Sequence, residues 1–158
     1  MIKKVIAGTI LSAMTLFALP NDELKLAGIS QAAQKKLVVL TNMKLKGDEK
    51  EKFGKLYDEY QEVLMIHRIT ELKLIGHYAK NFTNMTNEAS DKLITEWLAV
   101  EKEELTLKKI YMDKFKGIMN TVEVIRYFQI ENRLQLMGEI QKSKLIPLAI
   151  PNNNNKEK

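Results

Sequence analysis

The chain contains no cysteine among its 158 residues. It therefore cannot form a disulfide, hold a metal through a thiolate or use a cysteine as a nucleophile. Stability must come from the burial of apolar side chains, and a chain of this length can bury roughly two-thirds of the surface that it exposes when unfolded. We expect a single domain with a core of its own.

Helix-breaking residues are also scarce. The only prolines are Pro20, Pro147 and Pro151, and the stretch between the first two is rich in Lys, Glu, Leu and Ile, which favour helix. We predict four long helices, at about residues 23–45, 49–82, 87–118 and 121–146. The breaks between them are short, so successive helices fold back antiparallel. The predicted fold class is all-α, built from antiparallel hairpins of long helices.

Two of the predicted helix starts carry capping residues. Thr86 precedes the third helix, where its hydroxyl can accept a hydrogen bond from a free backbone N–H. Asn120, with Glu123 three residues later, resembles a capping box at the start of the fourth helix. Both signals support the predicted boundaries.

The residues that catalysis commonly needs are missing as well. Outside the first twenty residues the serines are Ser30, Ser90 and Ser143, and none lies in a nucleophile elbow. The chain has no glycine-rich phosphate loop. We predict that the protein is not an enzyme and has no cofactor.

The net charge of +5 is spread along the chain, because lysines alternate with glutamates and aspartates. A nucleic-acid-binding surface needs clustered basic residues, so this pattern indicates solvated helix surfaces instead. We therefore expect no nucleic-acid partner.

The first residues have the layout of an export signal. Lys3 and Lys4 form a basic head, and Val5 to Leu19 is an uncharged, mostly apolar run. That run is shorter than the roughly 20 residues of a membrane-spanning helix. We predict a signal peptide at residues 1–18, export to the periplasm and no membrane span after cleavage. Residues 19–146 then form one helical domain, and residues 147–158 form a disordered tail.

Polar residues interrupt the main apolar stripe of three predicted helices. These residues are His67 and Glu71 in the second helix, Glu101, Glu104 and Lys108 in the third, and Gln129 and Asn132 in the fourth. We interpret them as a buried, hydrogen-bonded network that sets register. The alternative is a metal site, with His67 and Glu71 joined by Glu101 or Glu104.

Two helices also carry a second apolar strip, on the side opposite the main stripe. The strip of the second helix contains Met65, Ile69 and Leu72, and that of the fourth contains Tyr127, Ile130, Leu134 and Met137. A simple bundle needs one apolar side per helix. The extra strips must pack on the first helix, form a homodimer or bind a partner protein.

Two segments at helix starts resemble the LTxxQ-type motifs of the small periplasmic helical proteins grouped around Spy and CpxP. Leu45-Lys46-Gly47-Asp48-Glu49 keeps the leucine, and Met85-Thr86-Asn87-Glu88-Ala89 keeps the threonine. A stronger resemblance, to uncharacterised proteobacterial relatives, lies in Phe53 to Gln61, Arg126 to Leu134 and Ile146-Pro147-Leu148. Together these segments span roughly the last hundred residues.

The resemblance implies an all-α helical hairpin, often a cradle-shaped dimer. It also implies ATP-independent chaperoning, or an accessory role in envelope stress or metal stress. We therefore expect a periplasmic protein that binds unfolded clients or partner proteins through its apolar strips. The alternatives are a periplasmic metal-binding sensor and a structural interaction module.

Overall fold

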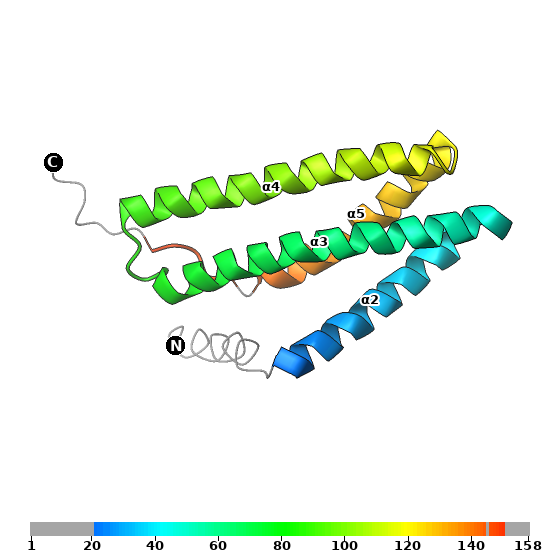
Figure 1. Ribbon diagram of the computed structural model, residues 1–158. Helices are drawn as coiled ribbons and strands as arrows, with labels where there is room; N and C mark the ends of the chain where they lie inside the picture. Colours follow the sequence, from blue (N-terminus) through cyan, green and yellow to red (C-terminus); the bar gives the residue numbers. More distant parts are fainter. Residues whose placement is uncertain (1–20, 145, 151–158) are drawn as a thin grey trace. The chain divides into compact units, whose positions relative to one another are not determined.

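The computed structural model describes residues 21–144 and 146–150, with side chains from Gln31 onward. Within these residues the chain forms four helices and no strand: α2 (Asn21–Met43), α3 (Gly47–Asn81), α4 (Asn87–Lys116) and α5 (Thr121–Ser143) (Figure 1). The all-α prediction is confirmed, with each boundary within a few residues of its expected place. The predicted signal peptide lies outside the described residues.

The chain divides into two compact units. One contains α2 and the part of α5 from Ile125 onward. The other contains α3, α4, the first turn of α5 and the segment from Ile146. Among the described helices, none is both long enough and apolar enough to cross a membrane. The single-domain organisation and the dimer remain predictions.

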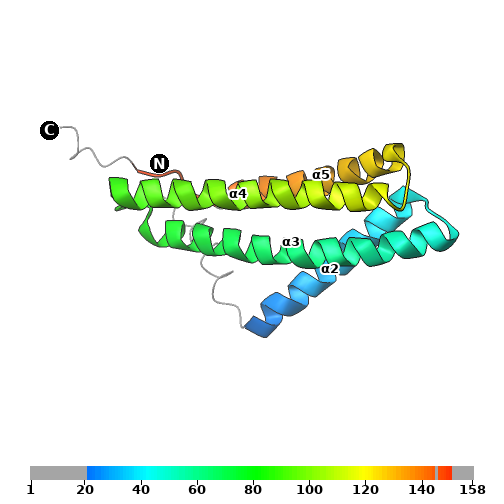
Figure 2. The ribbon, with the colours of Figure 1, turned by 45° about the horizontal axis from the view of Figure 1, so that its top comes forward.

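Helices α3 and α4 form an antiparallel hairpin, and they lie side by side in both views (Figures 1 and 2). Its core is aromatic. The ring centroids of Phe53 and Phe115 lie 5.4 Å apart, and those of Tyr60 and Tyr111 lie 4.7 Å apart. Phe53, Tyr60 and Phe115 are completely buried. Such ring pairs add to the stabilisation that burial of their large apolar surface already gives.

Both predicted capping signals are present. The Thr86 hydroxyl accepts a hydrogen bond from the Ala89 amide at 3.1 Å, which satisfies one free N–H at the start of α4. The side chain of Asn120 accepts from the Glu123 amide at 3.0 Å, and the Glu123 carboxylate accepts from the Asn120 amide at 3.1 Å. This reciprocal pair is a capping box, and four residues separate the end of α4 from the start of α5.

The unit of α2 and α5 is held together differently. Lys35 of α2 forms an ion pair with Glu131 of α5, and the exposed fractions of the two side chains are 15% and 2%. Nearer the end of α2, the guanidinium of Arg126 donates to the Asn42 carbonyl oxygen at 2.9 Å. The contact that lies later in α2 lies earlier in α5, so the two helices pair antiparallel.

Candidate functional site: an apolar face of the hairpin

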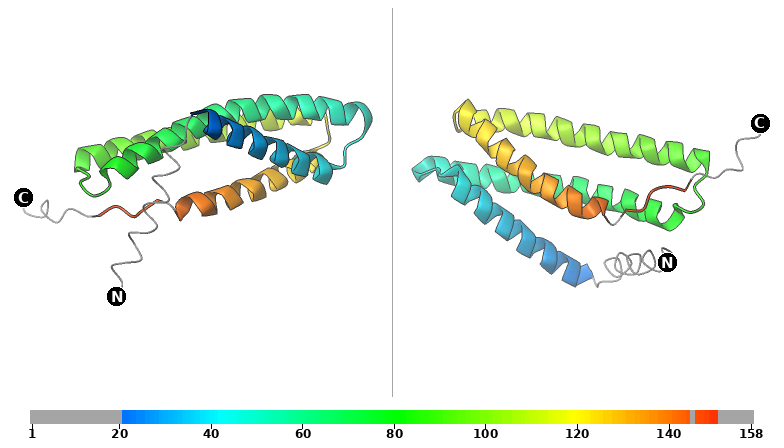
Figure 3. Two further views of the ribbon diagram at one scale, coloured as in Figure 1. Left: turned by 90° about the horizontal axis from the view of Figure 1, so that it is seen from below. Right: turned by 180° about the vertical axis from the view of Figure 1, so that it is seen from behind.

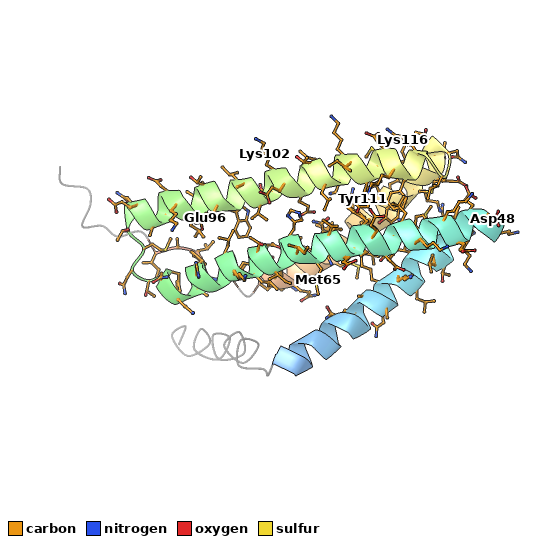
Figure 4. All side chains as sticks on the ribbon, viewed as in Figure 1. Asp48, Met65, Glu96, Lys102, Tyr111 and Lys116 are labelled. Carbon is orange, nitrogen blue, oxygen red and sulfur yellow. The ribbon has the colours of Figure 1, made fainter. Side chains whose placement is uncertain are left out.

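The apolar strip predicted on the second helix is exposed to solvent. Met65 and Ile69 are each 46% exposed and Leu72 is 49% exposed. In Figure 4, Met65 lies on the side of α3 that points away from α4, whereas Tyr111 lies between the two helices. The strip is therefore separate from the aromatic core of the hairpin.

Helix α4 carries a matching row that the sequence analysis missed. Ile94, Leu98 and Leu105 are 57%, 58% and 68% exposed. Their spacing of four and seven residues places all three on one side of the helix, because an α-helix turns about 100° per residue. The signal was present in the sequence. The row is hard to see in the sequence because it contains Glu101, which we interpreted as a member of the core stripe.

The two rows lie on the same face of the hairpin. Angles around each helix axis can be measured from the buried core row, in the direction of increasing residue number. On α3, Met65 and Leu72 lie at roughly 100 to 120°. On α4, Leu98 and Leu105 lie at roughly 110 to 130°. Because the helices face each other and run antiparallel, residues displaced from the core in the same rotational sense share a face.

The register of the hairpin also brings the rows level with each other. Tyr60 stacks on Tyr111, and His67 lies near Glu103. In this register Leu72 is level with Leu98, and Met65 is level with Leu105. The rows form one surface, which we call the apolar face; it consists of Met65, Ile69, Leu72, Ile94, Leu98 and Leu105.

The opposite side of the hairpin, the polar face, confirms this geometry because its residues touch across the two helices. The Glu59 carboxylate accepts hydrogen bonds from the Lys114 ammonium at 2.6 Å and from the Tyr111 hydroxyl at 2.8 Å. Lys114 and then Tyr111 lower the pKa of Glu59 below its ordinary value. Burial, followed by the Glu59 carboxylate, raises the pKa of Tyr111.

His67 also lies on the polar side, half-buried, with its Nδ1 atom 3.7 Å from a carboxylate oxygen of Glu103. The sequence had pointed to Glu101 or Glu104 as its neighbour on α4. In the part of the chain that the structure describes, no three histidine, aspartate or glutamate side chains gather as a metal site requires. The donor set that would favour the metal-sensor alternative is therefore not assembled among these residues.

The other predicted network residues of the hairpin do not form a buried layer. Glu71, Glu104 and Lys108 are half-buried. Glu101 is exposed, and it accepts a hydrogen bond from the indole Nε1 of Trp97 at 2.8 Å. Their long side chains reach solvent past the edge of the aromatic core, as charged side chains on helices commonly do.

On α5 the buried row differs from the predicted one. Gln129 and Asn132 are exposed, and the buried polar residue is Glu131. The predicted strip is divided: Tyr127 is completely buried, Ile130 and Leu134 are half-buried, and Met137 is exposed. The sequence pattern predicted a surface position for Glu131, because glutamate is a charged residue. In the structure Glu131 instead continues the buried row of Val124, Tyr127 and Phe128. Its partner Lys35 is 96 residues away.

Comparison of the chain with family models, with curated proteins and with solved structures finds no match. The function is therefore inferred from the fold and from the apolar face.

Proposed function

We propose that the protein is a periplasmic, non-enzymatic helical binding protein of the Spy and CpxP kind, chaperone-like or accessory to envelope stress. It binds unfolded or partner proteins through the apolar face of the α3–α4 hairpin. The supporting observation is that six large apolar side chains stand exposed on the two helices, with Met65 level with Leu105 and Leu72 level with Leu98. A contiguous exposed apolar surface of this kind is a recognised mark of protein interaction.

The chemistry of this face suits clients of varied sequence. The hydrophobic effect is non-directional, so a face of Leu, Ile and Met selects for apolar surface rather than for one sequence. The flexible thioether of Met65 adapts to different shapes. Binding through burial needs no nucleotide, consistent with the absence of a phosphate loop.

The expected binding strength fits a chaperone that releases its clients. About half to two-thirds of each of the six side chains is exposed, so its complete burial contributes on the order of 1 kcal/mol. Losses of translational and conformational freedom oppose that gain. Binding is therefore weak and reversible, and an unfolded client can leave and fold.

The proposal is tested by placing charges on the apolar face. The double variant Leu72→Lys and Leu98→Lys, with one substitution on each helix, should abolish suppression of the aggregation of an unfolding test protein. Both side chains lie outside the aromatic core, so far-UV circular dichroism and the melting temperature should stay nearly unchanged. Light scattering during heating of the test protein gives the readout.

The hairpin offers a matched control. Ile66 and Ile110 are also exposed, at 63% and 49%, but they lie on the polar face. The variant Ile66→Lys and Ile110→Lys adds the same charge to the same two helices and should leave the activity intact. Equal loss of activity in both variants would contradict the assignment of the face.

The same variants separate the remaining uses of the apolar face. If it joins two copies of the chain, the Leu72 and Leu98 variant should halve the mass measured by light scattering. If it is packed against the rest of the chain, unfolding should become easier by several kcal/mol, as when charges enter a core. Wild-type protein that fails to slow aggregation at several-fold molar excess would rule out the chaperone function.

A further inference from the structure

The segment that follows α5 is attached to the end of α3. The Tyr78 hydroxyl donates a hydrogen bond to the Pro147 carbonyl oxygen at 2.6 Å, and the Ile150 amide donates to the Phe82 carbonyl oxygen at 3.5 Å. Figure 3 shows this stretch, drawn in red-brown, running without helical structure beside the ends of α3 and α4. We call residues Ile146–Ile150 the C-terminal segment. The sequence predicts a disordered tail over residues 147–158. Its first four residues instead lie against the end of α3, and residues 151–158 lie outside the described residues.

The C-terminal segment is apolar and meets the hairpin at the end of the core row of α3. Tyr78 and Phe82 lie one to three turns beyond Leu72 along α3, and their ring centroids are 6.3 Å apart. Ile146 and Pro147 are half-buried, whereas Leu148 is 90% exposed. The core row of α3 therefore ends in two rings that already hold an extended apolar chain.

We propose that Tyr78 and Phe82 form a binding site for extended apolar chain, that the C-terminal segment is its intramolecular ligand, and that an unfolded client takes the place of this segment. An extended apolar stretch of the chain already lies there, and it is held through backbone groups that any unfolded chain also offers. This inference rests on the proposed function for the identity of the competitor, but the site and its intramolecular ligand stand apart from it.

The contacts suit a ligand of any sequence. Tyr78 donates to a backbone carbonyl oxygen, and Phe82 accepts from a backbone amide. Every residue offers the first partner, proline included, and every residue except proline offers the second. An unfolded chain presents these groups and a folded protein pairs them, so the site distinguishes unfolded apolar chain from folded surfaces.

The test uses the whole chain in two forms. In the detached variant, Ile146→Asp with Ile150→Asp weakens the contact of the C-terminal segment while Tyr78 stays intact. The probe is a fluorescent synthetic peptide with the sequence of residues 144–152, KLIPLAIPN, and binding is followed by anisotropy. We expect the detached variant to bind the peptide at least tenfold more tightly than wild type, in which the site is occupied. Equal binding by the two proteins would overturn the proposal.

Two tyrosine variants of the detached chain locate the site. Tyr78→Phe removes the hydroxyl that donates to the Pro147 carbonyl, and it should weaken peptide binding about three- to tenfold. Tyr111→Phe removes a comparable hydroxyl, 2.8 Å from Glu59 on the polar face, and should leave binding unchanged. Equal effects from both substitutions would overturn the assignment of the site to Tyr78.

Detachment also has a spectroscopic signature. Burial raises the pKa of Tyr78 above its ordinary value of 10.0. Its pKa should return toward that value in the detached variant, as measured by ultraviolet titration against the Tyr78→Phe protein. An unchanged titration, with no gain in peptide binding, would show that the segment does not cover the site.

Competition then separates this inference from the proposed function. An unlabelled unfolded protein should displace the peptide from the detached variant, and the detached variant should suppress aggregation at lower concentration than wild type. Failure of the unfolded protein to displace bound peptide would overturn the claim that clients take the segment's place. A chain that binds the peptide but never slows aggregation would support the intramolecular ligand and overturn the chaperone function.

Discussion

The α3–α4 hairpin and the unit of α2 and α5 both bury apolar side chains, but they differ in how deeply their polar contacts are buried. In the hairpin, tilted ring pairs bury a large apolar area, and the polar contacts between the helices stay near solvent. The other unit also buries Val39, Tyr127 and Phe128, but there the ion pair between the helices has one partner, Glu131, that is almost completely buried. Apolar packing tolerates small changes of shape, whereas a buried charge tolerates almost no change in its partner.

This difference indicates separate roles for the two kinds of contact. The aromatic core supplies stability, because burial of large rings is the strongest favourable term available to a chain without disulfides. The ion pair between Lys35 and Glu131 contributes little net stability, because desolvation offsets most of its Coulomb energy. It joins one turn of α2 to one turn of α5, because Glu131 lies buried beside Lys35.

The largest expected effect comes from the aromatic core. Phe115→Ala removes a completely buried ring that contacts Phe53 and Tyr60, and should lower the free energy of unfolding by about 3 to 5 kcal/mol. Urea unfolding followed by circular dichroism measures it. A loss below about 1 kcal/mol would show that the rings are not the main stabilising contact of the hairpin.

The ion pair should be nearly as sensitive to loss of one partner. Lys35→Ala leaves the buried Glu131 carboxylate without its ammonium and should cost about 3 kcal/mol. Replacement of both partners, Lys35→Met with Glu131→Leu, should restore most of that loss. Lys55→Ala breaks an exposed pair with Glu51 and is the control, expected to cost under about 0.5 kcal/mol. Equal costs for the two lysines would remove the contrast between the units.

A smaller effect is expected at the start of α5. Asn120→Ala removes the side chain that accepts from the Glu123 amide, and should cost about 1 kcal/mol. Asn120→Ser keeps an acceptor at the N-cap and should lose only a fraction of that. Thermal unfolding of the two variants, compared with wild type, measures the difference.

The smallest effect is a pH dependence on the polar face. Lys114 and Tyr111 lower the pKa of Glu59, so its contribution is fully present above the ordinary value of 4.5 and is lost as pH falls through the lowered value. Glu59→Gln should remove this acidic step from a plot of melting temperature against pH. Glu51→Gln, on the exposed i,i+4 pair, should alter the plot less. A step that persists in the Glu59 variant would have to come from another carboxylate.

Much of the fold follows from the sequence, because helix propensity, scarce prolines and capping residues are local signals. Thr86 and Asn120 make the caps that their positions predict. The pairing of α2 with α5 was not predictable in the same way. Its ion pair joins Lys35 to Glu131, which are 96 positions apart in the sequence. Hydrophobic periodicity also predicts a surface position for a glutamate, whether or not it is buried.

The sequence predicted the part of the candidate site on α3 but not the part on α4. The strip on α3 stands out because Met65, Ile69 and Leu72 repeat at helical spacing away from an aromatic core row. The strip on α4 is interrupted by Glu101, and only the register of the hairpin shows that Leu98 is level with Leu72. The contact of Pro147 with Tyr78 was unpredictable, because no pattern in an extended segment indicates where it lies.

Trp97 is the only tryptophan of the chain, and it lies on α4, next to Leu98. Intrinsic fluorescence excited at the indole band therefore reports on the hairpin alone, whereas circular dichroism averages over every helix. The indole N–H already donates to Glu101 beside the apolar face. Arrival of an apolar chain there should exclude water from the ring and shift its emission to shorter wavelength, so binding can be followed on the unlabelled protein in real time.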